Sequence, residues 1–352
     1  MENEKIINYL NSVNRNINLM EVCGTHTMAI SRFGIRNLLS KNINLISGPG
    51  CPVCVTPDSS LDYIYDLSLH QDIIITTYGD MIRVPGSDPS FTLEKAKAKG
   101  ADVRIVYSSI DALKIAEENK DKRVVFLGIG FETTMPSTAV AILEAEKNKT
   151  ENFYVYSMHK KVEPVIRALI EDKEIKIDGF ILPGHVACIL GQQGFNYLKG
   201  YKISGAITGF EFDQLLYGIY TLVKNINENK FEVDNCYKSA VSYETNNTAI
   251  NLFEEIFEIK DDNWRGIGII KNSGYKINKK YEKYDIEKIF PNNVIIHKKK
   301  YNCRCGDVIK GLIKPNSCSL FGKVCNPDYP IGPCMVSSEG SCAAYYKYND
   351  EI

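Results

Sequence analysis

The sequence predicts an α/β protein built on parallel β-sheets, followed by a cysteine-rich tail. Short β-branched runs alternate with amphipathic stretches over the first two-thirds of the chain, which is typical of strands and helices in parallel layers. The series restarts at Val124, which predicts two consecutive α/β domains at about 40–120 and 121–228; one larger sheet is the alternative. Six of the eleven cysteines lie among Gly and Pro in the last 50 residues.

The individual elements follow from the spacing of apolar residues. The predicted strands are 43–47, 72–77, 103–107, 124–128, 153–157, 179–182 and 205–207. The predicted helices are 4–16, 28–39, 60–70, 110–119, 136–147, 162–171 and 246–257. Residues 224–235 are polar and predict a linker. Residues 271–300 are basic and Tyr-rich with little periodicity, so we expect no regular element there.

Composition excludes several classes of function. A formal net charge of -1 argues against a nucleic-acid binder held by phosphate contacts. The start of the chain is charged, and no uncharged apolar run approaches the ~18 residues that span a bilayer. We therefore expect a cytoplasmic protein with no membrane segment. Because thiols stay reduced in that compartment, the cysteines indicate metal binding or catalytic redox chemistry rather than structural disulfides.

The tail cysteines have a spacing that suits a metal site. Four of them follow the pattern Cys303-x14-Cys318-x6-Cys325-x16-Cys342. Four thiolates from loops can hold a [4Fe-4S] cluster or Zn²⁺. Zinc sites usually consist of two tight Cys-x2–4-Cys knuckles, so this uneven spacing favours the cluster. Cys305 and Cys334 are then surplus, and Cys305 is an alternative to Cys303 as the first ligand.

Cys51 and Cys54 form a C-x-x-C motif between a predicted strand and a predicted helix. A helix N-terminus favours the thiolate, and two thiols at this spacing can close a disulfide and so store two electrons. We favour this redox use over half of a zinc site. Nearer the N-terminus, Cys23 and His26 lie three residues apart, a spacing that suits a nucleophilic pair, a metal half-site or a packed thiol beside a surface histidine.

Further polar residues follow predicted strands. Glu132, Thr133 and Thr134 come between a strand and a helix, where backbone N–H groups can bind an anion and Glu132 can act as a base; helix capping is the alternative. Asp80 and His185 also follow strands. Because open α/β folds bind ligands beyond the carboxyl ends of their strands, these positions predict one shared cleft.

Taken together, the motifs resemble those of the HypD family of hydrogenase maturation proteins over essentially the whole chain. The matching segments are Glu21-Val-Cys-Gly-Thr-His-Thr27, Gly48-Pro-Gly-Cys-Pro-Val-Cys54, Gly130-Phe-Glu-Thr-Thr134, Leu182-Pro-Gly-His-Val186, Trp264-Arg-Gly-Ile-Gly268, Cys303-Arg-Cys-Gly-Asp307, Phe321-Gly-Lys-Val-Cys325 and Met335-Val-Ser-Ser-Glu-Gly-Ser-Cys342. The departures are the surplus cysteines Cys188, Cys236 and Cys334, which need not be ligands.

The resemblance implies a role in building the Fe(CN)2CO centre of [NiFe] hydrogenases. It implies a HypC-like chaperone that shares the iron and a HypE-like partner, working with HypF, that donates cyanide. The centre then passes to the precursor of the hydrogenase large subunit. The resemblance also implies a third, discontinuous domain formed by residues 1–39 and 229–352, which carries the [4Fe-4S] cluster. The resemblance thus implies that the whole protein is an accessory assembly scaffold with redox activity rather than a stand-alone enzyme.

Residue by residue, the resemblance implies that the Cys23 thiolate binds an iron ion, which transiently carries CN and CO ligands. It implies that His26 is a further ligand or an orienting group. Cys51 and Cys54 become the redox pair. The predicted cluster ligands are Cys303, Cys318, Cys325 and Cys342. Two other classes compete with this interpretation: a thioredoxin-like thiol–disulfide oxidoreductase with a structural zinc tail, and a purely structural scaffold.

Overall fold

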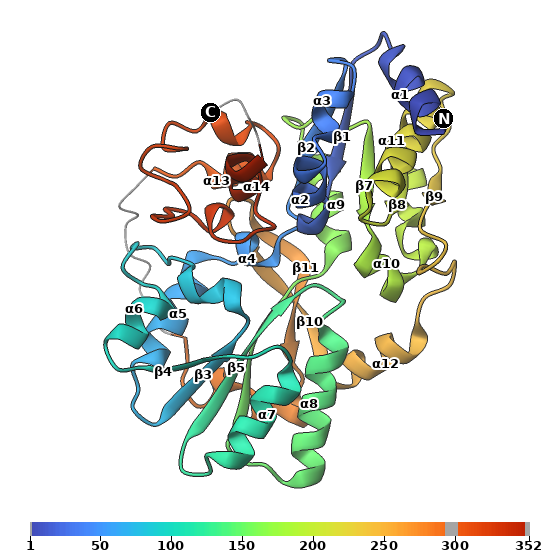
Figure 1. The fold of residues 1–352 in the computed structure, drawn as a ribbon. Helices are drawn as coiled ribbons and strands as arrows, with labels where there is room; N and C mark the ends of the chain where they lie inside the picture. The colour runs from blue at the N-terminus through green and yellow to red at the C-terminus, as the bar shows by residue number, and fades with distance from the viewer. Residues whose placement is uncertain (1, 293–301, 349–352) are drawn as a thin grey trace.

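The computed structural model describes residues 2–292 and 302–348, within which two parallel sheets and one antiparallel hairpin are present (Figure 1). The strands are β1 (Ile17–Glu21), β2 (Ile43–Ser47), β3 (Ile73–Thr77), β4 (Asp102–Ile105), β5 (Arg123–Gly130), β6 (Phe153–His159), β7 (Gly179–Pro183), β8 (Ser204–Thr208), β9 (Val233–Asn235), β10 (Phe257–Trp264) and β11 (Gly268–Ile277). Sheet A has the order β2-β1-β7-β8-β9, and sheet B has the order β4-β3-β5-β6. The predicted α/β class with two parallel sheets is confirmed.

Helices cover both sheets. Within the described residues they are α1 (Glu2–Asn11), α2 (Gly24–Arg32), α3 (Ile35–Leu38), α4 (Pro52–Val55), α5 (Asp58–Ser68), α6 (Leu93–Ala98), α7 (Ser109–Glu118), α8 (Met135–Asn148), α9 (Val162–Glu171), α10 (Gly184–Leu190), α11 (Phe212–Asn227), α12 (Asn247–Ile256), α13 (Cys305–Ile309) and α14 (Ser341–Tyr348). Short 3-10 helices are η1 (Gly79–Arg83), η2 (Gln192–Tyr201), η3 (Lys279–Tyr284), η4 (Ile286–Lys288), η5 (Pro315–Ser317) and η6 (Pro333–Met335). None of these described helices is long and apolar enough to cross a membrane.

All seven predicted runs form strands, although the edge strands β2 and β4 are only partly buried. Every residue of β3, β6, β7 and β8 is buried, as expected for parallel strands covered by helices on each side. β5 and β6 extend two residues further than predicted, to Gly130 and His159. Their carboxyl ends therefore reach further toward sheet A than the apolar runs alone indicate.

The strands are divided between the sheets differently from the predicted ranges 40–120 and 121–228. β3 and β4 pair with β5 and β6, so sheet B crosses the predicted boundary. Sheet A begins with β1, which the sequence did not predict, and β1 lies between β2 and β7. Its run Ile-Asn-Leu-Met-Glu is short and half polar, so its apolar signal is weak. The chain thus leaves sheet A after β2, completes sheet B and returns at β7.

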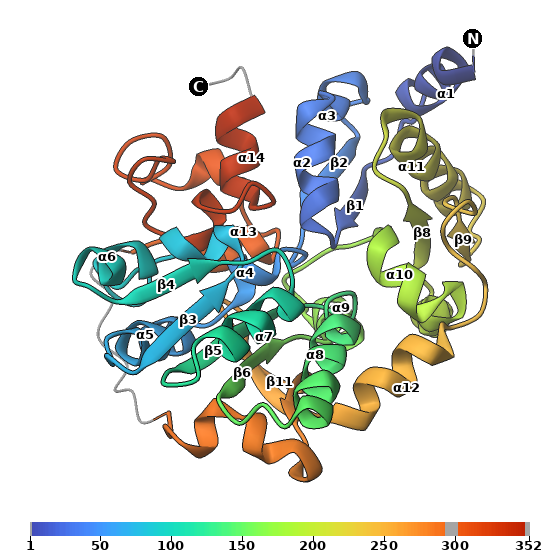
Figure 2. The same ribbon diagram turned by 60° about the horizontal axis from the view of Figure 1, so that its bottom comes forward.

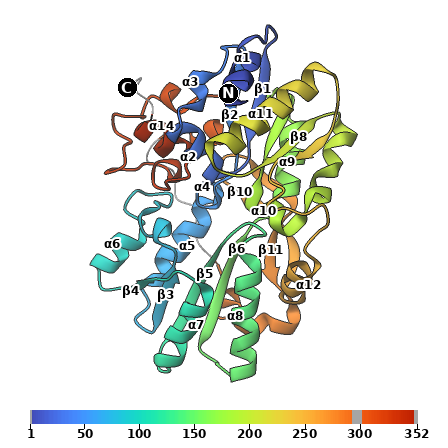
Figure 3. The ribbon, with the colours of Figure 1, turned by 45° about the vertical axis from the view of Figure 1, so that its right-hand side comes forward.

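The N-terminal segment consequently belongs with sheet A, and not with the tail as the predicted range 1–39 implied. α1 packs against α11, as Figure 3 shows, and Leu10 contributes to the same apolar cluster as Leu19 and Leu216. The tail still touches this region, because α14 packs against α2. The guanidinium of Arg36 lies 5.0 Å from the ring centroid of Tyr345 in that contact.

The region expected to lack regular structure, 271–300, begins inside a hairpin. β10 and β11 pair antiparallel from Phe257 with Ile277 to Trp264 with Gly268. Most of β10 is at least partly exposed, which explains why its sequence lacks a continuous apolar run. The predicted linker 224–235 is also partly regular, because α11 continues to Asn227 and β9 follows. The end of the predicted irregular stretch, 293–300, lies outside the described residues.

We expect Leu19→Ala to destabilise the protein strongly if residues 17–21 form a central strand. Leu19 is fully buried in sheet A, so its truncation should cost about 2–5 kcal/mol of unfolding free energy. Urea unfolding followed by circular dichroism measures this. The control Asn14→Ala changes an exposed position just before β1 and should cost about 0.5 kcal/mol or less. Equal effects of the two substitutions would contradict the central position of β1.

Candidate active site

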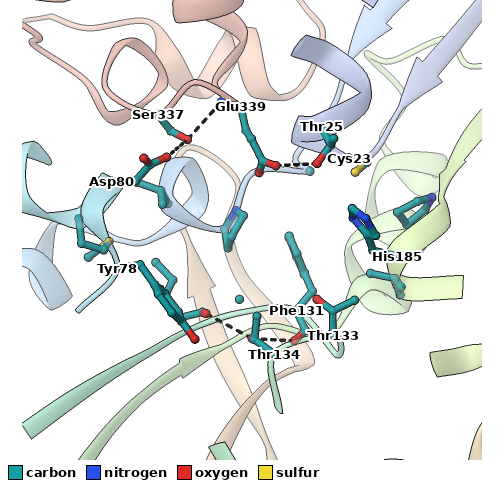
Figure 4. Close-up of a pocket in the computed structure, with 18 of the residues that line it drawn as sticks. Cys23, Thr25, Tyr78, Asp80, Phe131, Thr133, Thr134, His185, Ser337 and Glu339 are labelled. Carbon is teal, nitrogen blue, oxygen red and sulfur yellow. Dashed lines mark hydrogen bonds between the residues drawn. The ribbon is translucent and has the colours of Figure 1, made fainter. Parts of the chain in front are cut away.

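The carboxyl ends of the two sheets face one another across a cavity of about 330 Å³. Its walls come from the segments that follow β1, β2, β3, β5 and β7, together with the tail. The predicted cleft beyond the strand ends is therefore present. Figure 2 shows α14 of the tail beside α2. The polar or reactive side chains in its lining are Cys23, Thr25, Tyr78, Asp80, Thr133, Thr134, His185, Ser337 and Glu339. Figure 4 shows Cys23, Thr25 and Glu339 along one wall and Tyr78, Thr133 and Thr134 along the opposite wall.

Cys23 is held at the junction of β1 and α2. It is the N-cap residue of α2, with extended backbone angles, and its side chain lines the cavity. The loop after β2 presses against it: a Cβ atom on Gly50 would lie 2.1 Å from the backbone N of Cys23. The N–H of Gly24 also donates to the carbonyl of Gly50 at 3.1 Å. Only glycine at position 50 allows this approach, which fixes where the thiol points.

The environment of Cys23 keeps its thiol protonated in the absence of a cation. Burial, followed by the negative charge of Glu339, raises the pKa of Cys23 to about 11. Backbone N–H groups of His26 and Thr25 act in the opposite direction, because they donate to the sulfur at the start of α2. A metal ion bound here would therefore displace a proton from Cys23, and its affinity would rise with pH.

His26 lies behind Cys23 and does not line the cavity. Its ring is fully buried, and Nε2 lies 3.1 Å from the carbonyl oxygen of Gly209 and 3.3 Å from that of Thr208. Nε2 must carry the proton to donate to these carbonyls, and Nδ1 has no hydrogen-bond partner among the described residues. Burial lowers the pKa of His26 to about 4, so the ring is neutral near pH 7. These contacts tie α2 to the loop after β8.

The Glu132, Thr133 and Thr134 motif is split between two places. Thr133 and Thr134 line the cavity just before α8 begins. Glu132 instead accepts a hydrogen bond from the backbone N–H of Val162 at 3.0 Å, at the start of α9. Burial raises the pKa of Glu132 to about 7, and its other carboxylate oxygen has no partner among the described residues. Glu132 therefore anchors α9 to this loop and does not face the cavity.

Residues of the tail close the cavity, which the sequence did not predict. The Oγ1 of Thr25 donates to Glu339 at 2.6 Å, and the Oγ of Ser337 donates to Asp80 at 2.6 Å (Figure 4). The segment from Ser337 to Glu339 thus bridges α2 beside sheet A and η1 beside sheet B. Burial raises the pKa of Glu339. The Met335–Cys342 motif contained both tail residues, but nothing in its spacing indicated that they reach Cys23.

Cys51 and Cys54 lie directly behind the cavity wall. Pro52 and Val53, between them in α4, line the cavity, whereas both thiols are buried on the other side. Their Sγ atoms are 2.6 Å apart, and the N–H of Cys54 donates to the Sγ of Cys51 at 3.2 Å. A disulfide bond of about 2.05 Å can form here with little backbone movement. Both cysteines are free thiols in the structure.

The tail thiols continue from this pair as a connected set. Cys54 interacts with Cys334, which in turn interacts with Cys305 and Cys342. Cys305 interacts with Cys303, and Cys325 lies within electrostatic range of both Cys303 and Cys318. We call this set the thiol network; its members are Cys51, Cys54, Cys303, Cys305, Cys318, Cys325, Cys334 and Cys342. Cys334, which the spacing left without a role, links its two halves.

Several groups around the outer thiols can stabilise negatively charged sulfur. The N–H of Ile331 points at the Sγ of Cys325 at 3.4 Å, and a Cβ on Gly332 would lie 2.8 Å from the Sγ of Cys303. Arg265 is a buried cation beside Cys303, Cys305 and Cys334. Backbone N–H donors and a buried guanidinium are groups that stabilise thiolates.

The predicted ligand set is brought together only in part. Cys303, Cys318 and Cys325 are neighbours, whereas Cys342 lies against Cys334 at the start of α14. Within residues 2–292 and 302–348, no three Cys, His, Asp or Glu side chains are arranged to hold one metal ion. Cys188 and Cys236 lie outside the network, near the carbonyl of Ala240 and the hydroxyl of Thr221.

The fold and site define a two-sheet α/β protein in which a buried cysteine faces a cleft backed by redox-capable thiols. The sequence profile described as "HypD: Hydrogenase formation hypA family" matches residues 2–349. The chain is 45% identical over 337 residues to the hydrogenase maturation factor HypD2 of Bradyrhizobium diazoefficiens, covering 94% of this chain and 88% of that protein. It is 42% identical over 342 residues to the hydrogenase maturation factor HypD of Escherichia coli, covering 96% and 90%. The chain therefore belongs to the HypD family of hydrogenase maturation factors.

We expect Glu339→Gln to make Cys23 more reactive toward iodoacetamide near pH 8. Removing the carboxylate charge lowers the pKa of the Cys23 thiol from its value of about 11, and each unit gives about tenfold more thiolate below the pKa. Mass spectrometry of the labelled peptide between pH 7 and pH 11 gives the titration curve. Glu144→Gln on the exposed face of α8 is the matched control and should leave the curve unchanged. Identical curves for both variants would show that Glu339 does not act on Cys23.

Proposed function

We propose that the cavity is the place where the iron centre of [NiFe] hydrogenases is assembled, with the iron as cargo. The observation that carries this proposal is the position of Cys23: its thiol lines a cavity between the two sheets, and the Cys51/Cys54 pair lies directly behind the wall. Thiolates are strong ligands for iron, and burial keeps water away from such a site. His26 holds α2, and hence Cys23, against the loop after β8.

In this proposal the iron is shared with a partner. A HypC-like chaperone supplies a second thiolate, and a HypE-like protein, charged by HypF, brings cyanide as a thiocyanate. The cavity opens to the surface, which gives such partners access to Cys23. The centre with its CN and CO ligands leaves for the precursor of the hydrogenase large subunit. The chain then acts as an assembly scaffold with redox activity, consistent with the names of its relatives as maturation factors.

Cyanide release from the partner needs two electrons, which the Cys51/Cys54 dithiol can supply. The S–CN bond of the thiocyanate breaks, and the two cysteine S–H groups become one S–S bond. One of their protons goes to the partner's thiolate and the other to cyanide, so the products are a thiol, hydrogen cyanide and a disulfide. The cyanide carbon then binds iron at Cys23 as its proton leaves. The 2.6 Å separation of the two Sγ atoms supports this role.

The start of α8 is suited to an incoming anion. α8 has 14 residues, and Thr133 and Thr134 precede it at the edge of the cavity. The first N–H groups of a helix are without intrahelical partners and attract negative charge; in α8 these are the N–H groups of Met135 and Ser137, because Pro136 has none. The hydroxyl of Thr134 donates to the carbonyls of Ile129 and Phe131, at 3.3 and 3.2 Å, which fixes the turn. We propose that these N–H groups orient cyanide before it reaches iron.

We propose that a [4Fe-4S] cluster binds to the tail thiols, where Arg265 supplies a buried positive charge. Cys303, Cys318, Cys325 and Cys342 would hold it, with Cys342 moving from its contact with Cys334. When bound, such a cluster supplies one electron at a time. The thiol network gives a continuous sulfur connection between this end of the tail and Cys54. Membership of the family favours this maturation role over a general thioredoxin-like oxidoreductase.

We expect Cys51→Ser to abolish reductive cyanide release. The reduced protein, mixed anaerobically with a thiocyanate-charged HypE-like partner and the HypC-like chaperone, should release one cyanide for each disulfide formed, because each step consumes one dithiol. Cyanide is measured colorimetrically and the disulfide by mass spectrometry. The control Cys188→Ser changes a half-buried thiol outside the network and should behave as wild type. Undiminished cyanide release by Cys51→Ser would remove this pair from the reaction, and release without disulfide would point to another reductant.

A further inference from the structure

Arg265 is a buried cation at the tip of the β10–β11 hairpin. Its side chain is 5% exposed and forms an ion pair through Nη2 with Asp58 at the start of α5. The Nε and Nη1 atoms are buried and have no hydrogen-bond partner among the described residues. A guanidinium carries five N–H donors, and leaving buried donors on a charged group unpaired is costly. The site therefore offers more positive charge and more donors than the described protein groups use.

A second buried cation shows the usual arrangement. Lys160 is 2% exposed, and its Nζ donates to the carboxylate of Asp262 at 2.5 Å and to the carbonyl of Asn263 at 2.8 Å. Both of its neighbours are protein oxygens, as is typical of a structural buried charge. Arg265 instead has one carboxylate partner and three thiols within electrostatic range, those of Cys303, Cys305 and Cys334.

The fold fixes Arg265 between the two halves of the thiol network. The backbone N–H of Arg265 donates to the carbonyl of Val55 at 2.8 Å, which ties the hairpin tip to the end of α4. On the tail side, a Cβ on Gly266 would lie 2.2 Å from the Cα of Gly306, so the two backbones touch. Gly266 has φ +78°, which favours glycine. The hairpin tip, which carries the Arg265 cation, thus contacts both α4 and α13.

We propose that Arg265 is the counter-cation of the tail sulfur site: its free guanidinium N–H groups neutralise sulfur-borne negative charge there and raise the reduction potential of the cluster that Cys303, one of the three thiols nearby, helps to hold. The inference rests on the cluster of the proposed function. Four thiolates and a [4Fe-4S] core carry net negative charge, which grows by one unit on reduction. A nearby buried cation stabilises the more negative state and thereby favours the reduced form. Arg265 is a positioning residue, since it acts through the cysteines.

The test is a redox titration of the full-length, anaerobically purified protein, followed by visible absorption and electron paramagnetic resonance. Arg265→Gln removes the charge and should shift the midpoint potential to a more negative value. Arg265→Lys keeps the charge and should recover part of the wild-type potential. Asp58→Asn is the matched control: it breaks the same ion pair but leaves the guanidinium charge uncompensated, so the potential should stay unchanged or become more positive.

Each of four results would overturn the inference. Equal potentials in wild type and Arg265→Gln would show that the charge does not act on the cluster. A midpoint potential of Asp58→Asn that shifts in the same negative direction as that of Arg265→Gln would show that the ion pair acts only through packing. Iron and sulfide contents are measured alongside, with roughly four of each expected per chain. Loss of both from Arg265→Gln alone supports the proposal, and loss from Asp58→Asn as well contradicts it. A wild-type protein without iron and sulfide would contradict the cluster itself, and with it this inference.

Discussion

The bridge formed by the tail segment from Ser337 to Glu339 is the contact on which the site depends. It joins Thr25 beside sheet A to Asp80 beside sheet B through two hydrogen bonds of 2.6 Å. With the packing of α14 against α2, it holds the thiol-bearing tail beside Cys23 and closes the gap between the strand ends of the two sheets. The same bridge brings Glu339 beside Cys23, so it sets both the shape and the charge of the cavity.

Burial gives the thiols their chemical character. Burial first, and the contacts with Cys334 and Cys51 next, raise the pKa of Cys54, so Cys54 rests as a thiol until a cation or an electron acceptor arrives. Cys23 behaves in the same way because of burial and Glu339. Loading with iron and proton release are therefore coupled at Cys23. The contact with Cys305 and burial also raise the pKa of Cys303, whereas the charge of Arg265 acts in the opposite direction.

The sequence predicted the α/β class, seven strands and the shared cleft, because strong apolar runs and glycine-bearing strand ends are local signals. It did not predict β1, whose polar residues give a weak apolar signal although the strand is central in sheet A. The contacts of the tail with the N-terminal thiols could not be predicted, because they join residues far apart in the sequence. Glu339 reaches Cys23 from 316 residues away, 339 minus 23, and Cys334 reaches Cys54 across a similar span. The sequence also could not predict the direction of the Glu132 side chain, because its motif faces both the cavity and α9.

The infrared spectrum of the anaerobic complex with a HypC-like chaperone tests the central claim most directly, because bound CN and CO absorb where protein does not. Cys23→Ala should lack the cyanide and carbonyl bands while its tail iron and sulfide stay at the wild-type level. Cys236→Ala, which changes a thiol beside Thr221 and outside the network, should keep both bands. Unchanged bands in Cys23→Ala would show that the iron centre is assembled at another place.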